Sequence, residues 1–402
     1  MDRCSRLICC LLQDHKYTKM KIVHICLNAY TDGWGYQENL LSQYQMKEGH
    51  EVTIIASITH LAPFLIEQEI NEIRSRGCEY VFNGIKTYRL KTSIQTTNLS
   101  VHNPGLFRIL NNIKPDIIFH HDCCPPSLIK VVLYKVFHSK VKIVVDNHAD
   151  IINQSPNKVW NFVYNRIIVK LGLKLITPFV TKYYGVTPAR CDYLKSPFGV
   201  PEKKISLLPI GGDTDLVDSI KESKVELRRK YRLPVDGRII VSGGKMGIDK
   251  GTDSLINAFK SLREGNSELS LVLFGKFSDI ETEKLAKESE GVFVEGWCDR
   301  QKTIELLKLA DVACWPIHHT TLIEDALACA TPLVLRKTGN TIHTVDGNGI
   351  LIENGTEKEL YNAISIILHA GLYNNFKNSA EKMREKFGYH NISKQIMEDC
   401  YS

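Results

Sequence analysis

The sequence contains no Cys-x-x-Cys pair, although 12 of its 402 residues are cysteines. Several of these cysteines lie inside apolar runs, among them Cys26 and Cys314. This spacing argues against a structural zinc site and against a disulfide framework, and it favours buried free thiols in a reducing compartment. We therefore expect a cytosolic, cytoplasmic protein.

The sequence also lacks an apolar run of the roughly 20 residues that a membrane-spanning helix needs. The stretch from Leu7 to Leu12 is apolar but far shorter, and no small-residue cleavage site follows it. A strand-like run begins only at Met20. We expect residues 1–19 to be a loose N-terminal extension, and we expect no transmembrane helix.

No block of lysines or arginines is present, so the sequence indicates no arm that binds nucleic acid. The formal net charge of +6 is spread along the chain, with 24% charged and 43% hydrophobic residues. These values are ordinary for a soluble globular protein. The mild positive charge is compatible with anionic substrates or an anionic membrane face.

Short apolar runs alternate with amphipathic segments from Met20 onward. In the first half we expect strands at 22–27, 51–56, 87–90, 116–120, 142–146 and 182–186, and helices at 37–47 and 126–137. The pattern then restarts near residue 210, with strands at 238–242, 271–274, 292–295, 312–315, 333–336 and 350–352. Near-continuous apolar strands joined by helices predict parallel sheets covered on both faces. The fold class is therefore α/β, with two doubly wound domains.

We expect these domains to cover residues 20–209 and 210–378, with a helical tail at 379–402 that kinks at Gly388. In open α/β sheets, ligands bind outside the carboxyl ends of the strands. With two such sheets, we expect the active site in the cleft between the domains.

A glycine-rich segment, SGGKMGIDKGTDSLINAF (242–259), follows the first strand of the second half. We expect the strand to end at Ser242 and a helix to begin near Gly251. Glycines allow close backbone approach, and a helix N-terminus offers free amides to an anion. Lys245 and Lys250 lie in the intervening turn, where both ammonium groups can reach one diphosphate. The alternative is a solvated loop with two ordinary lysines.

The same segment contains neither the G-x-x-x-x-G-K-[ST] spacing of a P-loop nor the G-x-G-x-x-G fingerprint. The missing fingerprint disfavours a nicotinamide-dependent oxidoreductase. The segment instead resembles the retaining glycosyltransferases of family 4 (group 1), in which a strand is followed by G-R-L, three residues and K-G. Lys245 stands at the position of the family's Arg, and Lys250, followed by Gly251, stands at that of its Lys.

The resemblance covers roughly residues 20–400 and is most specific in the second half. It implies the GT-B fold, with two Rossmann-like domains facing a central cleft, and a last helix (379–402) that returns to the first domain. It also implies that Lys245 and Lys250 are catalytic, because they hold the donor diphosphate and stabilise the leaving nucleotide. The WGYQENLL loop (34–41) and the Trp-Pro pair before the acidic motif resemble members that build bacterial surface polysaccharides.

The acidic motif departs from the family pattern. The family has two glutamates eight positions apart, of which the second binds the ribose. Asp325 aligns with the second one, and Glu324 is beside it, but Ile317 stands at the first. The loop HHTT (318–321) is expected to contact the donor sugar or its phosphate instead. For Trp297 we weigh contact with the nucleobase against ordinary packing. The donor-binding residues implied in this way are Gly243, Gly244, Gly251, Gly275, Gly296, Trp297, Thr320, Thr321, Glu324 and Asp325.

In the first half, a glycine-containing loop follows the first strand, and the clusters HHDCC (120–124) and DNHAD (146–150) follow later ones. The family has a His at the tip of the fifth strand that reaches the donor sugar or acceptor, and His148 is our candidate for this catalytic position. The alternative is a simple strand-end turn. The acceptor-binding residues implied by the resemblance are Asp32, Gly33, Gly35, Tyr36, Asp122, Asn147 and Arg190.

We expect no metal ion and no cofactor other than the nucleotide-sugar co-substrate. The His and Asp clusters show no ligand spacing that would place metal ligands on one face. The D-x-D string at 213–215 falls in the interdomain turn and is interpreted as a linker.

The resulting hypothesis is a metal-independent, retaining glycosyltransferase that moves a sugar from a nucleotide-sugar donor to a glycan or lipid-linked acceptor. A lipid-linked acceptor would bring the protein into peripheral contact with the inner face of the membrane. Two alternatives stay open: a nucleotide-sugar epimerase with the same fold, and a non-catalytic subunit that binds a sugar nucleotide.

Overall fold

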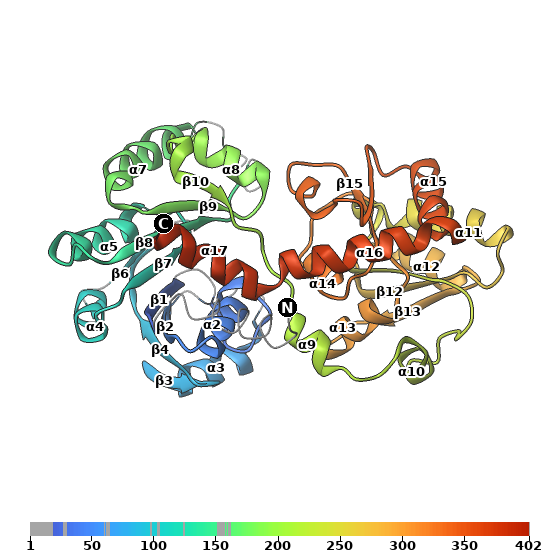
Figure 1. The fold of residues 1–402 in the computed structure, drawn as a ribbon, viewed down its shortest axis with the longest axis horizontal. Coiled ribbons are helices and arrows are strands. Elements are labelled where there is room, and N and C mark those ends of the chain that lie inside the picture. Colours follow the sequence, from blue (N-terminus) through green and yellow to red (C-terminus); the bar gives the residue numbers. More distant parts are fainter. Residues whose placement is uncertain are drawn as a thin grey trace, which may run out of the picture. The chain divides into compact units, whose positions relative to one another are not determined.

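Figure 1 shows the computed structural model of the chain, which describes residues 19–26, 30–59, 61, 65–96, 99–102, 105–123, 125–150, 157, 159 and 162–401. Nearly all of the expected extension (1–19) lies outside these residues. The contacts divide the chain into two compact units, one up to Leu208 together with Ser393–Ser402, and one of Pro209–Ile392. The segment that belongs again to the first unit thus begins at Ser393, compared with the expected 379.

The first unit is built on an eight-stranded sheet in the order β10-β9-β8-β7-β1-β2-β4-β3. Its strands run parallel, except that β3 is antiparallel to β4. A separate antiparallel pair, β5 and β6, lies outside it. The strands are β1 (Lys21–Cys26), β2 (Glu51–Ser57), β3 (Glu79–Phe82), β4 (Ile85–Leu90), β5 (Thr92–Thr96), β6 (Leu99–His102), β7 (Ile117–His121), β8 (Lys142–Asn147), β9 (Lys182–Gly185) and β10 (Ile205–Leu207).

Helices connect these strands, as the alternating pattern predicts for a parallel sheet. The last helix crosses the boundary between the units, because its first four residues are counted with the second. The helices are α2 (Gln37–Lys47), α3 (Glu67–Ser75), α4 (Gly105–Ile113), α5 (Pro125–Phe137), the π-helix η2 (Phe162–Val169), α7 (Lys170–Ile176), η3 (Thr177–Phe179), α8 (Pro188–Lys195), η4 (Glu202–Lys204) and α17 (Tyr389–Tyr401).

The second unit has a six-stranded, wholly parallel sheet in the order β13-β12-β11-β14-β15-β16. Its strands are β11 (Ile239–Met246), β12 (Ser270–Phe277), β13 (Val292–Gly296), β14 (Val312–Trp315), β15 (Leu333–Arg336) and β16 (Gly349–Ile352). Its helices are α9 (Thr214–Ser219), α10 (Lys224–Lys230), η5 (Ile248–Lys250), α11 (Thr252–Glu264), α12 (Ile280–Glu288), α13 (Arg300–Leu309), α14 (Leu322–Ala328), η6 (Ile342–Thr344), α15 (Glu357–Leu368) and α16 (Ala370–Phe387).

Both faces of the second sheet are buried. Along β11, Ile239 and Val241 belong to one apolar core and Ile240 to another, because successive side chains point to opposite faces of a strand. None of the three is exposed. Burial on both faces explains why these strands appear in the sequence as continuous apolar runs. Among the helices of the described residues, none has the length and apolar character that crossing a bilayer requires.

The expectation that the first strand of the second unit ends at Ser242 is wrong. Strand β11 continues to Met246, so Lys245 lies on the strand and not in a turn. The extension pairs with β12, with Gly244 opposite Gly275. A Cβ on Gly275 would stand 2.1 Å from the carbonyl oxygen of Gly244, so only glycine allows the strands to pair here.

Candidate functional site

Each large sheet has one place where the strand order reverses. In the first unit the reversal lies between β1 and β7, and in the second between β11 and β14. Connections leave such neighbours in opposite directions, and the carboxyl ends of the two strands border a crevice where ligands bind. The two units therefore offer one candidate site each.

The second unit has a pocket of about 330 Å³ at the carboxyl ends of β11 and β14. It brings together both lysines of the glycine-rich segment and the loop that replaces the first family glutamate. Trp315, the last residue of β14, donates its indole N–H to the carbonyl oxygen of Gly243 (3.0 Å) and closes one wall. The lining residues are Gly243, Lys245, Lys250, Trp315, Ile317, His318, His319 and Thr320.

The polar side chains of this pocket are cationic or neutral. Lys250 Nζ lies 3.1 Å from Asp249 Oδ2, and this hydrogen bond lowers the pKa of Asp249. Lys245 is exposed and has no ion-pair partner among the described side chains. Burial lowers the pKa of His318, and the charge of Lys250 lowers it further, so His318 is neutral at pH 7. A diphosphate is the kind of ligand that such a pocket would attract.

The turn between Lys245 and α11 has the geometry of an anion site. Gly251 begins α11 with a left-handed φ of 71°, and no side chain caps the helix. A Cβ on Gly251 would stand 3.0 Å from atoms of Pro316 and Ile317, so the turn packs directly on the pocket loop. The amides of the first helical turn are therefore left without a side-chain cap beside Lys250.

The two acidic residues of α14 have different partners. Asp325 is buried, and both of its oxygens accept hydrogen bonds from the guanidinium of Arg300. Glu324 is also buried and bonds through Oε1 to His319 Nε2 (2.7 Å). Its Oε2 is buried without a hydrogen-bond partner among the described residues. Glu324 is therefore connected to the pocket through His319, whereas both carboxylate oxygens of Asp325 pair with Arg300.

The remaining donor-site candidates lie outside the pocket lining. Thr321 is exposed and precedes α14. Gly275 is required by the pairing of β11 and β12, as described above, and Gly244 opposite it has a positive φ of 101°. Gly296 ends β13 in a left-handed conformation (φ 62°), and the side chain of Trp297 after it is 85% exposed. Trp297 therefore does not pack as a core residue, and the packing alternative is wrong.

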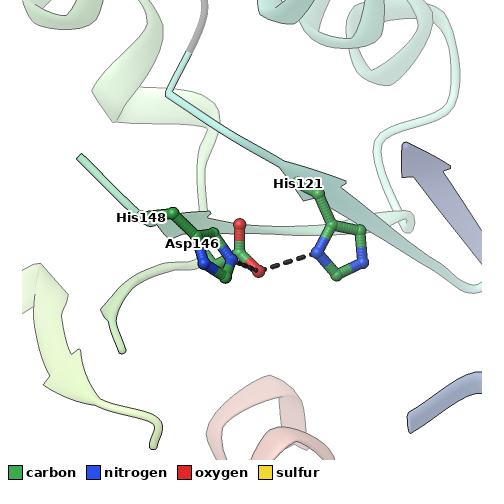
Figure 2. A group of neighbouring side chains, drawn as sticks. All are labelled: His121, Asp146 and His148. Atoms are coloured by element: carbon green, nitrogen blue, oxygen red, sulfur yellow. Dashed lines mark hydrogen bonds and ion pairs between the residues drawn. The ribbon is translucent and has the colours of Figure 1, made fainter. Parts of the chain in front are cut away.

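In the first unit, buried polar side chains from three adjacent strands meet at the reversal point. His121 at the end of β7 and His148 just after β8 both approach Asp146 Oδ2, at 2.7 and 3.2 Å (Figure 2). His24 on β1 bonds to His121 Nε2 through Nδ1 (3.0 Å) and to Gln45 of α2 through Nε2 (2.7 Å). The resulting chain runs from α2 across the sheet to His148.

Electrostatics separates the roles of these histidines. Burial lowers the pKa of His24 to about 3, so its ring stays neutral. Burial acts in the same direction on His148, but the charge and hydrogen bond of Asp146 outweigh it and raise the pKa to about 9. Burial would raise the pKa of Asp146, yet His121 and His148 hold it well below its usual range. His148 is therefore an imidazolium at neutral pH, and its side chain is 34% exposed.

Asp122 follows β7 in a left-handed conformation, with φ of 83°, which is unusual for a residue other than glycine. Its backbone N–H donates to Asp146 Oδ1 (3.0 Å), and its carbonyl oxygen lies 2.8 Å from His120 Nδ1. These two bonds hold the strained turn in place. Asp122 thus positions Asp146 through its backbone, whereas its side chain was expected to bind acceptor.

Asp32 was expected at the acceptor site, but the structure places it in a buried ion network. Its side chain is 0% exposed, and Oδ2 accepts hydrogen bonds from Arg76, Tyr80 and Arg89. Arg89 is itself fully buried. A charge taken out of water must be paired in this way, so Asp32 serves the packing of the first unit.

Asn147 and Arg190 also have structural partners. The amide of Asn147, which is 1% exposed, donates to the carbonyl oxygens of Ala149 (2.8 Å) and Arg190 (3.1 Å). Arg190 Nε lies 3.8 Å from Asp150 Oδ2. These contacts fix the loop that carries His148, and they place neither side chain in the His cluster.

The loop between β1 and α2 contains the other expected residues. Gly33 takes a left-handed φ of 81°, Gly35 is exposed, and Tyr36 precedes α2, where its ring contacts Trp34. The next residue, Gln37, is buried, and neither atom of its amide has a hydrogen-bond partner among the described residues. Such a buried amide normally finds a partner, so Gln37 is an additional candidate for contact with a ligand.

His121, Asp146 and His148 offer three ligand atoms within 4.8 Å of one another, so their types and spacing could hold a divalent cation. The expectation of no metal rested on the absence of ligand spacing along the chain. The structure shows that spacing along the chain was the wrong criterion, because β7 and β8 are neighbours in the sheet. In the geometry observed, both imidazoles already share Asp146 Oδ2 as ion-pair partners.

Sequence reasoning missed His24, Gln37 and Gln45. His24 had a visible signal, since it is a polar residue within the otherwise apolar run KIVHIC. Helix α2 had no such signal, because only the structure shows that it buries Gln37 and Gln45 along with Leu40 and Leu41. His121 lay within the HHDCC cluster but was not singled out.

Comparison with known proteins covers both units. Residues 223–386 match the family described as "Glycosyl transferases group 1", and residues 39–216 match the family described as "Glycosyltransferase Family 4". The two matched stretches follow one another and include the pocket of the second unit and His121, Asp146 and His148 of the first, whereas His24 and Gln37 precede them.

Two curated relatives and one solved structure are similar to the chain. A D-inositol 3-phosphate glycosyltransferase of Xylanimonas cellulosilytica is 30% identical over 39% of this chain and 41% of its own length. A GDP-mannose-dependent alpha-(1-6)-phosphatidylinositol monomannoside mannosyltransferase of Mycobacterium tuberculosis is 26% identical over 56% of this chain and 60% of its own. The chain thus spans about half the length of the curated relatives it matches. A glycosyltransferase from Rickettsia africae has the same fold, with a TM-score of 0.68 at 17% identity over 96% of this chain and 98% of that one.

Proposed function

The chain belongs to the group 1, family 4 glycosyltransferases and has their GT-B fold, and on this premise we propose that it transfers a sugar from a nucleotide-sugar donor to a glycan or lipid-linked acceptor. The transfer retains the anomeric configuration and uses no metal ion. The reaction belongs to the synthesis of a surface polysaccharide, at the cytoplasmic side of a membrane.

The observation that carries this proposal is the cationic pocket at the reversal point of the second sheet. The departing nucleoside diphosphate carries the charge that catalysis must stabilise. Lys245, Lys250 and the uncapped start of α11 supply fixed positive charge and N–H donors for it. The acceptor hydroxyl attacks from the face that the leaving group departs from, and the β-phosphate takes its proton.

Two further groups complete the donor site in this proposal. Thr320 lines the pocket next to the lysines and bonds to sugar hydroxyls or phosphate. Glu324 binds the ribose, because its Oε2 still needs a donor, and His319 fixes its other oxygen. Exposed Trp297 offers a flat face for the nucleobase.

In the first unit, we assign sugar contact to His148. Its Nε2 pairs with Asp146, and its Nδ1–H can donate a charged hydrogen bond to the sugar. The charge persists at neutral pH because of the neighbouring carboxylate. His148 therefore acts as a fixed cation beside the reacting sugar.

The test is thermal stabilisation of the purified full chain by UDP-, GDP- and CMP-sugars, with and without Mg²⁺. We expect one nucleotide class to raise the Tm equally in both conditions, and Lys250→Ala to abolish the rise. Lys260→Ala is the matched control, since Lys260 is an exposed lysine on the same helix, α11. Stabilisation that needs Mg²⁺, or that survives Lys250→Ala, contradicts the proposal.

The same protein separates the alternatives. Incubation with the stabilising donor and analysis of the sugar by NMR shows transfer with retention if the proposal holds. Conversion of the free nucleotide sugar to an epimer without acceptor identifies an epimerase. Binding without conversion, and without slow hydrolysis of the donor, identifies a non-catalytic subunit.

A further inference from the structure

Exposed apolar side chains are concentrated on one part of the first unit. The described chain has 22 large apolar side chains that are exposed, and 11 of them fall between residues 129 and 179. Single exposed apolar residues are ordinary, but a cluster marks an interaction surface. The members are Ile129, Leu133, Val136, Phe137, Val159, Phe162, Ile167, Ile168, Leu171, Leu175 and Phe179.

Helix α5 presents four of these side chains along one stripe. Ile129, Leu133, Val136 and Phe137 follow the i, i+4, i+7, i+8 spacing of a single helix face. Phe137 is 74% exposed. The other side of α5 contributes to the main apolar core of the unit, so the helix is apolar on both sides.

The continuous segment of η2 and α7 repeats this arrangement and adds charge. Ile167, Leu171 and Leu175 are exposed at intervals of four residues. The residue before each one is basic, namely Arg166, Lys170 and Lys174, and all three are exposed. An apolar stripe thus runs beside a cationic stripe, as in helices that lie in a membrane interface.

The two segments form one surface, which we call the α5–α7 face and define as the exposed side of α5, η2 and α7. Helices α5 and α7 are in contact and lie next to each other in Figure 1. The packing is close, because a Cβ on Gly172 would stand 2.6 Å from Pro125 Cβ. Both helices bury their inner sides in the same core, so their outer sides face the same way. Phe107 of α4 extends the surface, with its ring 6.4 Å from that of Phe137.

The charge of this face has one sign. Helices α4, α5, η2 and α7 contain no Asp or Glu. Between Cys123 and Cys191 the sequence has 10 Lys and Arg and only two acidic residues, Asp146 and Asp150, both at the strand-end site. The whole chain is nearly balanced, with 51 basic and 45 acidic residues, so the excess is local.

We propose that the α5–α7 face docks the protein on an anionic lipid bilayer. Exposed leucine and phenylalanine side chains enter the boundary between headgroups and acyl chains, while the lysines and Arg166 reach lipid phosphates. A second copy of this chain fits less well, because a symmetric contact would set the cationic face against itself. The purpose of this docking, access to a lipid-linked acceptor, rests on the proposed function, whereas binding to lipid itself needs no donor.

The test is co-sedimentation of the full chain with vesicles of phosphatidylcholine, with and without phosphatidylglycerol. We expect binding to the anionic vesicles, weakened by high salt. Leu171→Glu/Leu175→Glu should weaken binding on the order of a hundredfold, at about tenfold for each buried leucine. Lys170→Gln/Lys174→Gln should cost about fivefold for each cation. The matched control is Val81→Glu/Ile280→Glu, which adds the same charge at side chains that are 67% and 80% exposed elsewhere.

Three outcomes would overturn the proposal. In the first, the wild-type chain does not bind anionic vesicles. In the second, the control variant loses as much binding as Leu171→Glu/Leu175→Glu does. Alternatively, light scattering shows a dimer that Leu171→Glu/Leu175→Glu dissociates, which makes the face a contact between copies. Stabilisation by donor, measured in the same variant, should be unchanged, so failure of lipid docking and failure of the transferase assignment give different results.

Discussion

Replacing Asp146 with Asn should change the charge state of His148. In the native first unit, the Asp146 carboxylate lies 3.2 Å from His148 Nε2 and raises the pKa of His148 to about 9, against the effect of burial. Asp122 and Glu38 act in the same direction more weakly. Asn keeps the size and the acceptor oxygen of Asp but removes the charge, so burial then dominates and lowers the pKa of His148.

The size of the expected fall in pKa follows from the pKa of His148 in the native protein. A rise from 6.5 to about 9 corresponds to about 3.4 kcal/mol, at roughly 1.36 kcal/mol per pKa unit. The side chain is 34% exposed, so solvent screening reduces the interaction, and we take about half of it, roughly 1.7 kcal/mol. The pKa of His148 in Asp146→Asn should therefore fall by at least about one unit.

The same pKa shift also determines how the free energy of unfolding changes with pH. A pKa raised on folding means that the protonated ring stabilises the fold fully below pH 6.5 and that this contribution is lost as pH rises through about 9. Asp146 has a depressed pKa, and its own contribution is lost only at acid pH. The stability gap between wild type and Asp146→Asn should therefore be larger at pH 6 than at pH 10, as measured by urea unfolding.

The assay is an NMR titration of protein labelled with ¹³C at the histidine rings. The His148 signal is the one absent from His148→Gln. We expect its midpoint well above 6.5 in the wild type and clearly lower in Asp146→Asn. Asp150→Asn is the matched control, because Asp150 lies in the same loop but pairs with Arg190. A wild-type midpoint near 6.5, or an identical midpoint in both proteins, refutes the reasoning.

Four other predictions concern the second unit and the metal question. Arg232 has a left-handed φ of 55° just after α10, so Arg232→Gly should raise stability by about 0.5–1 kcal/mol in urea unfolding, and a lower midpoint contradicts this. Asp325→Asn should destabilise the protein by about 3 kcal/mol, because it leaves the Arg300 guanidinium half-buried without its carboxylate. Glu324→Gln keeps an acceptor for His319, so it should change stability by about 1 kcal/mol or less while donor affinity, measured by calorimetry, falls about tenfold. Dialysis against EDTA should leave the transfer rate unchanged, and recovery by added Zn²⁺ after a loss would assign metal to the His121 cluster.

Most of the two sheets could be predicted because their strands are buried on both faces. Continuous apolar runs such as Leu271–Phe274 and Val312–Trp315 predict buried strands when helices separate them. The strands that were missed are short and lie outside the parallel core. Strand β3 alternates exposed and half-buried residues and runs antiparallel at the sheet edge. Strand β11 was predicted to end too early because its glycines suggested a turn. Only the neighbouring strand β12 shows that these glycines lie within a paired strand.

The two candidate sites differ in how far the sequence could identify them. Lys245 and Lys250 lie five residues apart, so local spacing sufficed to bring them together in one pocket. The His cluster joins residues 97 apart along the chain, namely His24 and His121. Their contact depends on β1 and β7 being neighbours, which follows from the order of the whole sheet and from no local pattern. The ion network of Asp32 was not predicted for a similar reason, because its partners Arg76 and Arg89 lie 44 and 57 residues away along the chain.

The loss of the first family glutamate is consistent with the charges that surround its position. Ile317 lines the donor pocket and packs on Gly251, while the polar side chains of the lining are lysine, histidine and threonine. A carboxylate there would need a partner, and Lys250 is the nearest cation of the pocket wall to Gly251 along the chain. An ion pair between that carboxylate and Lys250 would weaken the binding of phosphate by Lys250. With isoleucine, the cations stay available to the diphosphate of the proposed donor. In the proposed function, this pocket then contacts the donor sugar through the neutral side chains of Thr320 and its neighbours, in addition to the charged His148 of the first unit.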